Sequence, residues 1–354
     1  MPERVISADS HVKVSHDQVK GHLAARYHES YDAAAGAFEA KMRRGAGAAN
    51  RAGAVIAKNA VFTRAGYGDP VERLKDMDTD GVDTEVLYCE VSAFRYLADM
   101  NDGVAESVRA FNDALYEFAQ VDPKRLIVSY QITINDIDMA VAEVERVVGL
   151  GGKSLQLPVF PNELGQLDYY HERYEPLFAL IEETGLPVCC HIGLNTSLDD
   201  LARRDPTPNG GVMVPLTPLM TAEAFGMWIM GGVFERFPGL KLVFVEPGLT
   251  WVAWWLDIVD DMVKRQGYEF PAISRLPSSY FHRNVHLTFI DEGLGLHRVR
   301  DLLGVENILW SSDFPHPVTS WPNSRKVIDE QFAGIPPDER ELILSGNATR
   351  VWNL

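Results

Sequence analysis

The sequence predicts a single (β/α)₈ barrel formed by residues 1–354. Short apolar runs alternate eight times with longer stretches of helical periodicity, which is the pattern of a parallel sheet covered by helices. The 354 residues, 46% of them hydrophobic, suffice for a barrel of this kind with two insertions. A doubly wound open sheet is the alternative, but no Gly-rich phosphate loop follows the first apolar run.

The eight apolar runs are the expected strands. They lie at 5–11, 84–90, 126–131, 153–157, 186–191, 240–246, 284–290 and 307–312. The expected helices lie at about 70–80, 101–120, 136–149, 172–184, 218–236, 249–265, 294–303 and 323–352. Pro70 after Asp69 is typical of a first helical turn, and Gly185 is typical of a helix end.

Two segments interrupt this alternation. Residues 12–67 form a polar insert after the first strand, and their Ala, Leu and Tyr content predicts short helices. Residues 194–217, rich in Asp, Pro and Gly, predict a long loop after the fifth strand. In a barrel enzyme, specificity is expected from segments such as these.

Charge and cysteine usage limit the partners. The net charge of −17 argues against nucleic acid and against an anionic membrane surface. No run of 18 apolar residues predicts a membrane span, and no signal segment is evident. The three cysteines, Cys89, Cys189 and Cys190, do not resemble a disulfide framework, so a cytoplasmic protein acting on a small molecule is expected.

Polar residues gather where expected strands end. Asp9 and His11 lie two residues apart on the first strand, so their side chains point to one face. His191, Glu246 and Asp313 follow the fifth, sixth and eighth strands. The carboxyl ends of barrel strands meet at one mouth, and carboxylates with imidazoles there would need a cation to balance them. These residues therefore predict a site for a divalent metal.

Several motifs also resemble the amidohydrolase-related proteins, in the branch of aminocarboxymuconate semialdehyde decarboxylase and the resorcylate and carboxyvanillate decarboxylases. The matching stretches are residues 6–11, 69–88, 190–193, 237–246, 310–316 and 343–350. They occur in order along nearly the whole chain. The resemblance implies a metal-dependent barrel enzyme, with a small carboxylate or cyclic substrate and a possible homodimer.

The resemblance also implies roles for individual residues. It makes Asp9, His11, His191 and Asp313 the ligands of one Zn²⁺ or Mn²⁺ ion. This chain departs from the family in having Asp where the first ligand is often His or Glu. Relatives with two metals use a carboxylated lysine on the fourth strand, but Lys153 lies at the start of that strand, which favours one metal.

Three functions remain open from the sequence. The first expectation is non-oxidative decarboxylation of a small aromatic or unsaturated acid, with Asp313 delivering the proton to carbon. Glu246 stands where the decarboxylases have a histidine, and a carboxylate there suits the alternative, hydrolysis of a lactone, amide or carbon–carbon bond by a metal-bound hydroxide. The third is a barrel that binds a ligand without catalysis.

Further residues are candidates for supporting roles. His316 is close to Asp313 in the sequence, and it either orients the site or is an ordinary loop residue. Arg43, Arg64 and Arg203 lie in the two inserts and are candidates to bind a substrate carboxylate, against the alternative of solvated surface charges.

Overall fold

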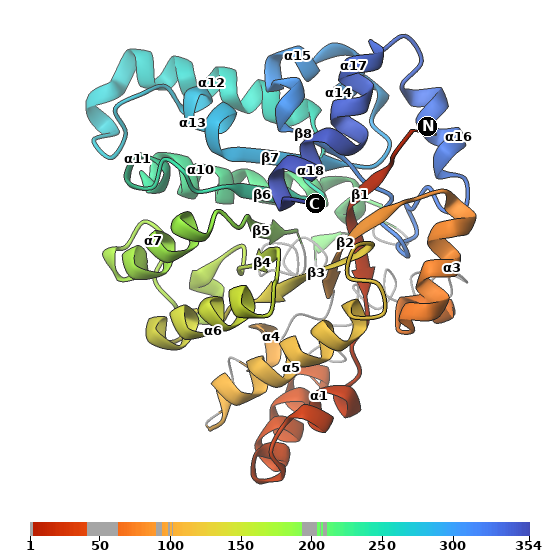
Figure 1. The fold of residues 1–354 in the computed structure, drawn as a ribbon. Coiled ribbons are helices and arrows are strands. Elements are labelled where there is room, and N and C mark those ends of the chain that lie inside the picture. Colours follow the sequence, from red (N-terminus) through yellow and green to blue (C-terminus); the bar gives the residue numbers. More distant parts are fainter. Residues whose placement is uncertain are drawn as a thin grey trace.

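The protein is a barrel of eight parallel strands surrounded by helices (Figure 1). This computed structural model describes residues 3–40, 63–89, 94–97, 100, 102–192, 204–205, 207 and 211–354. The strands follow one another around the sheet in chain order. They are β1 (Ile6–Val12), β2 (Thr84–Cys89), β3 (Leu126–Gln131), β4 (Ser154–Gln156), β5 (Val188–His191), β6 (Leu242–Val245), β7 (Val285–Phe289) and β8 (Ile308–Trp310). The predicted fold class and all eight strands are confirmed.

Backbone hydrogen bonds between β1 and the segment after β8 close the barrel. Asp313 N–H donates to the Asp9 carbonyl at 3.0 Å, and His11 N–H donates to the Phe314 carbonyl at 2.6 Å. These bonds join β1 to the segment that follows β8. They form a seam, defined here as residues 9–11 and 311–314, at the carboxyl end of the barrel.

Helices cover the outside of the strands. The described α-helices are α1 (His16–His22), a helix over 28–40, α3 (Pro70–Asp80), α4 (Phe94–Leu97), α5 (Val104–Ala119), α6 (Ile137–Gly149), α7 (Glu175–Thr184), α9 (Met213–Leu216), α10 (Ala222–Met230), α11 (Val233–Arg236), α12 (Thr250–Gln266), α13 (Pro277–Asn284), α14 (Gly293–Arg298), α15 (Arg300–Leu303), α16 (Ser324–Gln331), α17 (Pro337–Glu341) and α18 (Asn347–Trp352). Short 3₁₀ turns add η1 (Ala25–Tyr27), η3 (Ala65–Tyr67), η4 (Pro161–Leu164), η5 (Glu172–Tyr174), η7 (Thr217–Thr221), η8 (Gly267–Glu269) and η9 (Val305–Asn307), and a π-helical turn η10 spans Leu342–Gly346.

Local signals in the sequence explain several helix boundaries. The Asp69 carboxylate caps α3 by accepting from Val71 N–H and Glu72 N–H, with Pro70 in the first turn. The helix predicted over 218–236 is divided into η7, α10 and α11. Its last break lies at Gly232, whose φ of 73° only glycine adopts easily.

The barrel interior is filled by side chains. An interior cluster contains Ile6, Ala8, Val86, Tyr88, Ile127, Cys189, Val243, Val245 and Leu309, together with Ala348, Val351 and Trp352 of α18. Trp352 is buried, and its indole N–H donates to Ser154 Oγ at 3.1 Å. The last helix therefore plugs the amino-terminal end of the barrel. Lys153 donates to the Asn353 carbonyl at this same end, as its place at the start of a strand predicts.

The described part of the N-terminal insert contains α1, η1, the helix over 28–40 and η3, as its composition predicted. In Figure 1, α1 lies beside α5 at one end of the molecule. His22 of α1 contacts Glu117 of α5 at 3.2 Å, and Tyr27 donates to Glu106 of α5. Residues 41–62, and most of the predicted loop 194–217, lie outside the described residues.

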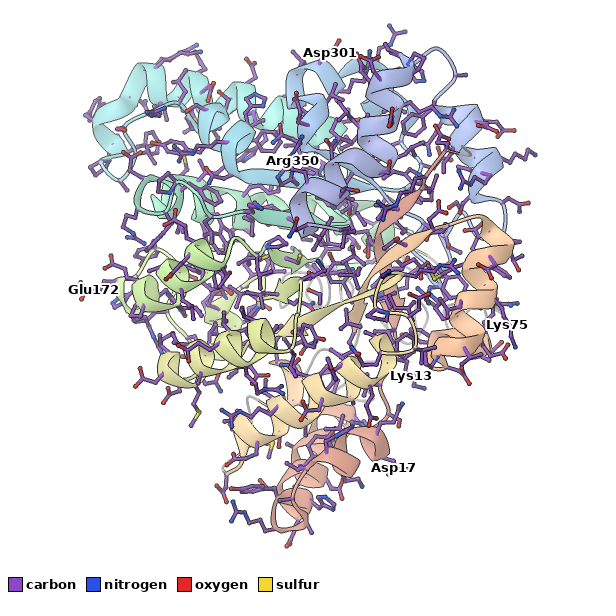
Figure 2. The ribbon with its side chains drawn as sticks, in the orientation of Figure 1. Lys13, Asp17, Lys75, Glu172, Asp301 and Arg350 are labelled. Atoms are coloured by element: carbon purple, nitrogen blue, oxygen red, sulfur yellow. The ribbon has the colours of Figure 1, made fainter. Side chains whose placement is uncertain are left out.

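The outer surface is charged. Lys75, Glu172 and Asp301 are exposed and project outward from the helical layer (Figure 2). Among the described residues, no helix combines the length and the apolar character that crossing a membrane requires.

Candidate metal centre

A β-bulge in β1 aims two polar side chains at the mouth of the barrel. Ile6 and Ala8 face the interior cluster, as alternation requires. The pairing register of β1 with β2 shifts between Ser7 and Ser10. The extra residue resets the alternation, so that Asp9 and His11 also face inward and Ser10 faces outward. The sequence predicted a shared face for the two ligand candidates, but it did not predict the bulge that turns this face inward.

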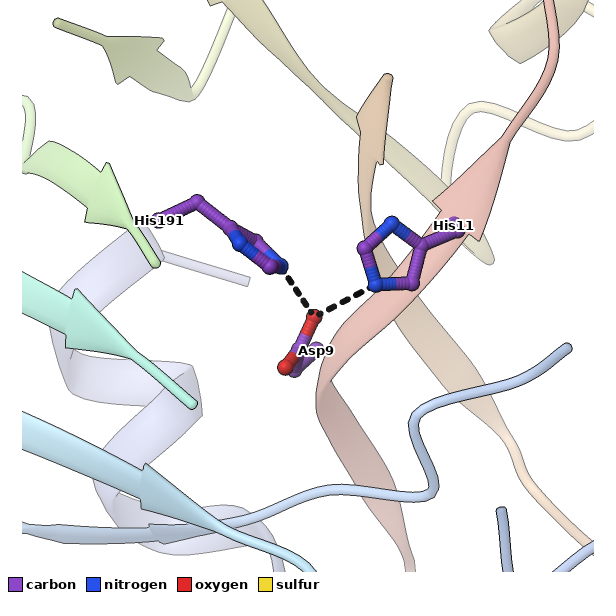
Figure 3. Close-up of side chains that lie close together, drawn as sticks. All are labelled: Asp9, His11 and His191. Atoms are coloured by element: carbon purple, nitrogen blue, oxygen red, sulfur yellow. Dashed lines mark hydrogen bonds and ion pairs between the residues drawn. The ribbon is translucent and has the colours of Figure 1, made fainter. Parts of the chain in front are cut away.

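Asp9 lies between two histidines (Figure 3). Asp9 Oδ1 is 3.3 Å from His191 Nε2 and 3.8 Å from His11 Nε2. The rings of His11 and His191 meet edge to face, with centroids 4.8 Å apart. Asp9 and His11 are fully buried, and β5 brings His191 from the other side of the barrel. Three predicted ligands thus converge within reach of one ion.

The segment after β8 supplies the next two members of the cluster. Asp313 Oδ1 is 3.0 Å from His11 Nε2 and 3.2 Å from His316 Nδ1. The His316 ring stacks on the His11 ring, with centroids 3.9 Å apart. His316 therefore contacts two of the candidate ligands directly.

Glu246 completes the cluster from the end of β6. Its carboxylate and those of Asp9 and Asp313 bring ligand atoms within 4.8 Å of one another. Its backbone N–H donates to Thr288 Oγ1 at 2.7 Å. Glu246 and Asp313 have φ values of 65° and 53°, a left-handed conformation that costs a non-glycine residue about 1–3 kcal/mol. Strain at these two positions is typical of a functional site.

Burial and neighbouring charges separate the pKa values of the four groups. Burial lowers the pKa of His11, and His316 lowers it further. Burial would also lower the pKa of His191, but Asp9 and then Glu246 outweigh it and raise this pKa to about 9. Burial and then Asp313 raise the pKa of Glu246 to about 8. Burial opposes ionisation of Asp313, yet His316 and His11 hold its pKa at about 2.

The donor set fits a divalent cation. Three overlapping triads place their ligand atoms within 4.8 Å of one another: Asp9, His11 and His191; His11, Asp313 and His316; and Asp9, Glu246 and Asp313. Asp9 Oδ2 and Asp313 Oδ2 are buried and have no hydrogen-bond partner among the described residues. Buried carboxylate oxygens left in this way are stabilised by a cation, and the imidazole–carboxylate mixture suits Zn²⁺ or Mn²⁺.

Of the three arginines predicted to bind the substrate, the structure describes Arg64. The Arg64 guanidinium hydrogen-bonds to the Asp76 carboxylate, with Nε 3.0 Å from Oδ1, and stacks over the Trp321 ring at 4.1 Å. Trp321 in turn packs on Phe314, the residue after Asp313. Arg64 is thus connected to the site through aromatic rings, although a carboxylate already occupies part of its donor fork. Arg43 and Arg203 lie outside the described residues.

Two polar residues at the barrel mouth escaped the sequence analysis. Gln131 ends β3 and Gln156 ends β4, and the two are paired across the sheet. Leu155 packs in the outer core and Ser154 contacts interior Cys189, so alternation places Gln156 inside the barrel. Gln156 is 6% exposed, and its amide oxygen has no hydrogen-bond partner among the described residues. Each is the polar last residue of an apolar strand, and this was the available signal.

Comparison with known proteins identifies the family. The amidohydrolase family model matches residues 9–354, which is nearly the entire chain. The chain belongs to the amidohydrolase family. This match confirms the predicted class of enzyme, which is a metal-dependent carboxy-lyase or hydrolase of the amidohydrolase superfamily.

Curated relatives of this amidohydrolase are named as decarboxylases. The γ-resorcylate decarboxylase of Rhizobium sp. (strain MTP-10005) is 24% identical over 308 residues, covering 80% of this chain and 86% of the relative. The 2-amino-3-carboxymuconate-6-semialdehyde decarboxylase of Dictyostelium discoideum is 22% identical over 293 residues, covering 81% and 77%. The branch indicated by the sequence motifs is thus confirmed.

Solved structures share the barrel. The 5-carboxyvanillate decarboxylase of Sphingomonas paucimobilis superposes with a TM-score of 0.78, at 23% identity and 99% coverage of both chains. A dihydroxybenzoic acid decarboxylase of Polaromonas sp. JS666, solved with bound manganese and the inhibitor 2-nitroresorcinol, gives a TM-score of 0.71 at 19% identity, covering 99% of this chain and 97% of the other. At this identity the superpositions support the fold.

Proposed function

We propose that this amidohydrolase is a carboxy-lyase that removes CO₂ from a small aromatic carboxylic acid without oxidation. The observation that carries the proposal is the convergence of three carboxyl groups and three imidazoles at one barrel mouth, in a family whose curated relatives here are named as decarboxylases. One divalent ion, Mn²⁺ or Zn²⁺, would be held by Asp9, His11, His191 and Asp313. A bound ion would supply Lewis acidity that orients the carboxylate and its neighbouring oxygen.

Glu246 takes the role of proton donor in this proposal. In the metal-free site its pKa is raised to about 8 while that of Asp313 is held at about 2, so of these two neighbouring carboxyl groups Glu246 is the one that holds a proton. Two neighbouring carboxyl groups with separated pKa values divide into an acid and a base. As the bond between the ring carbon and the carboxylate breaks, the ring carbon accepts the Glu246 proton and CO₂ leaves. Solvent then restores the proton, so that charge and atoms balance.

This assignment gives Glu246 the role of the histidine that the decarboxylases have at the same position. The sequence expectation gave proton delivery to Asp313, but its low pKa favours a role as ligand and as partner of His11 and His316. A carboxyl group that is buried and protonated can hold the proton that an imidazolium would otherwise hold.

The substrate would lie over the metal centre, at the mouth of the barrel, where Gln156 also lies. An amide at this position can hydrogen-bond a ring hydroxyl or carboxylate oxygen. We place the reaction in the cytoplasm because the three cysteines are buried thiols that form no disulfide among the described residues, as a reducing compartment permits. The resemblance also suggests a homodimer, which a measurement of the solution mass of the purified protein tests.

A substrate panel tests the reaction. The protein, loaded with Mn²⁺ or with Zn²⁺, is incubated with hydroxybenzoates in D₂O, and we expect CO₂ release with one deuterium placed on the product ring. His191→Ala should lose both metal and activity. A parallel panel of lactones and amides in ¹⁸O-water tests hydrolysis. An ¹⁸O-labelled acid there, without CO₂ from any benzoate, would replace the lyase by a hydrolase.

A further inference from the structure

A buried ion pair lies behind the metal centre, on the outer side of β1. Arg73 of α3 is fully buried, and its Nε is 2.5 Å from Glu85 Oε2 on β2, which is 3% exposed. Burying both charges is costly, and such pairs often stabilise a fold no better than apolar residues of similar volume. Arg73 Nη2 is moreover buried without a partner among the described residues. Stability alone therefore does not account for the pair.

The hydrogen bonds of Arg73 lead to the metal-ligand strand. Arg73 Nη1 donates to the His11 carbonyl at 2.9 Å. The guanidinium also lies over the Phe314 ring, with Cζ 4.3 Å from the ring centroid. The Phe314 carbonyl accepts the His11 N–H. One side chain thus contacts both strands of the seam, next to His11 on one strand and Asp313 on the other.

The hydrogen bonds of Glu85 lead to the bulge. Glu85 Oε1 accepts from Ser10 Oγ at 3.1 Å. Ser7, Ser10 and Ser312 form a triangle of hydroxyls 3.0–3.1 Å apart. Ser7 Oγ donates to the Asp9 carbonyl at 2.7 Å and accepts from Ser312 N–H at 2.9 Å.

These contacts hold the part of β1 that regular sheet pairing does not fix. The bulge between Ser7 and Ser10 interrupts the ladder, yet the directions of Asp9 and His11 depend on it. We propose that Arg73 and Glu85 are positioning residues for the metal centre, which clamp this bulge and the β1–β8 seam from outside the barrel. This inference rests on the proposed function, because it assumes that Asp9 and His11 are ligands.

The test removes the pair while keeping its volume. Arg73→Met with Glu85→Met avoids a lone buried charge, so that the fold should survive. We expect the Kd for Mn²⁺ to weaken about 10–100-fold, as is common when groups that orient metal ligands are removed. In the metal-free protein, the His11 and Asp313 amides should exchange with D₂O at least tenfold faster, while the α12 amides are unchanged. Cobalt-loaded protein should also show an altered visible spectrum.

The control is another ion pair. Arg300 and Glu339 join α15 to α17, with Nε 2.6 Å from Oε2, and within the described part of the chain neither side chain bonds to the seam. Arg300→Met with Glu339→Met should leave the Kd and the seam exchange within twofold of wild type.

If the double variant does not fold, Arg73→Lys decides the question. It keeps the charge opposite Glu85 but lacks the planar fork that reaches Glu85 and His11 together, so we expect at least threefold weaker Mn²⁺ binding. Unchanged seam exchange and an unchanged Kd in a folded variant would overturn the inference. If wild type binds neither Mn²⁺ nor Zn²⁺, the proposed function falls, and seam exchange still decides whether the pair fixes these strands.

Discussion

Metal binding should be coupled to the loss of a proton from His191. In the metal-free site, burial lowers the pKa of His191, but Asp9 and Glu246 outweigh burial and raise it to about 9. A protonated imidazole has no lone pair for a cation at Nε2, so His191 must release its proton before it binds. At pH 7 this release is opposed by about two pH units, which corresponds to about 2.7 kcal/mol or a 100-fold weaker affinity than above pH 9.

Calorimetry measures this coupling directly. Titration of the metal-free protein with Mn²⁺ at pH 7, in buffers of different ionisation enthalpy, should show release of at least one proton per ion. The affinity should rise about tenfold per pH unit between pH 6 and 8, because the imidazolium form dominates below its pKa of about 9. Tight binding with no proton release over this range would refute the conclusion that Asp9 keeps His191 protonated in the metal-free site.

Three further variants test other parts of the structure. Glu246→Gln should keep the metal but lower kcat about 100-fold or more, since an amide cannot supply the proton; the ring-deuteration assay measures this. Gln156→Leu should raise KM for hydroxybenzoates about tenfold with the Kd for Mn²⁺ unchanged, as a steady-state and binding comparison will show. Trp352→Ala should destabilise the fold by about 3–5 kcal/mol in urea, because it empties the plug of the barrel and frees Ser154.

For each of these variants, one outcome would contradict the prediction. Full activity in Glu246→Gln would mean that Asp313 or His316 donates the proton instead. A Gln156→Leu enzyme with unchanged KM would place that amide away from the substrate. For Trp352→Ala the control is Trp254→Ala on α12, where the indole is 64% exposed and little stability should be lost. Equal losses in the two tryptophan variants would contradict the assignment of α18 as a plug.

The sequence by itself determined the barrel and most of the candidate metal centre. Apolar runs of strand length, separated by helical patterns, leave few topologies open, because parallel strands must be joined by crossovers of regular length. Polar residues at the ends of such runs could be recognised one by one. Asp9, His11, His191, Glu246 and Asp313 were all found in this way, and their shared location follows from barrel closure.

Only the tertiary structure gave the contacts and the pKa shifts of these groups. The bulge that turns Asp9 and His11 inward, the stacking of His316 on His11 and the opposite pKa shifts of Glu246 and Asp313 depend on contacts between strands distant in the sequence. Burial and charge are properties of the assembled mouth, which no local pattern encodes. For the same reason, the sequence analysis did not single out Arg73 and Glu85, which the folded barrel brings together as a buried ion pair.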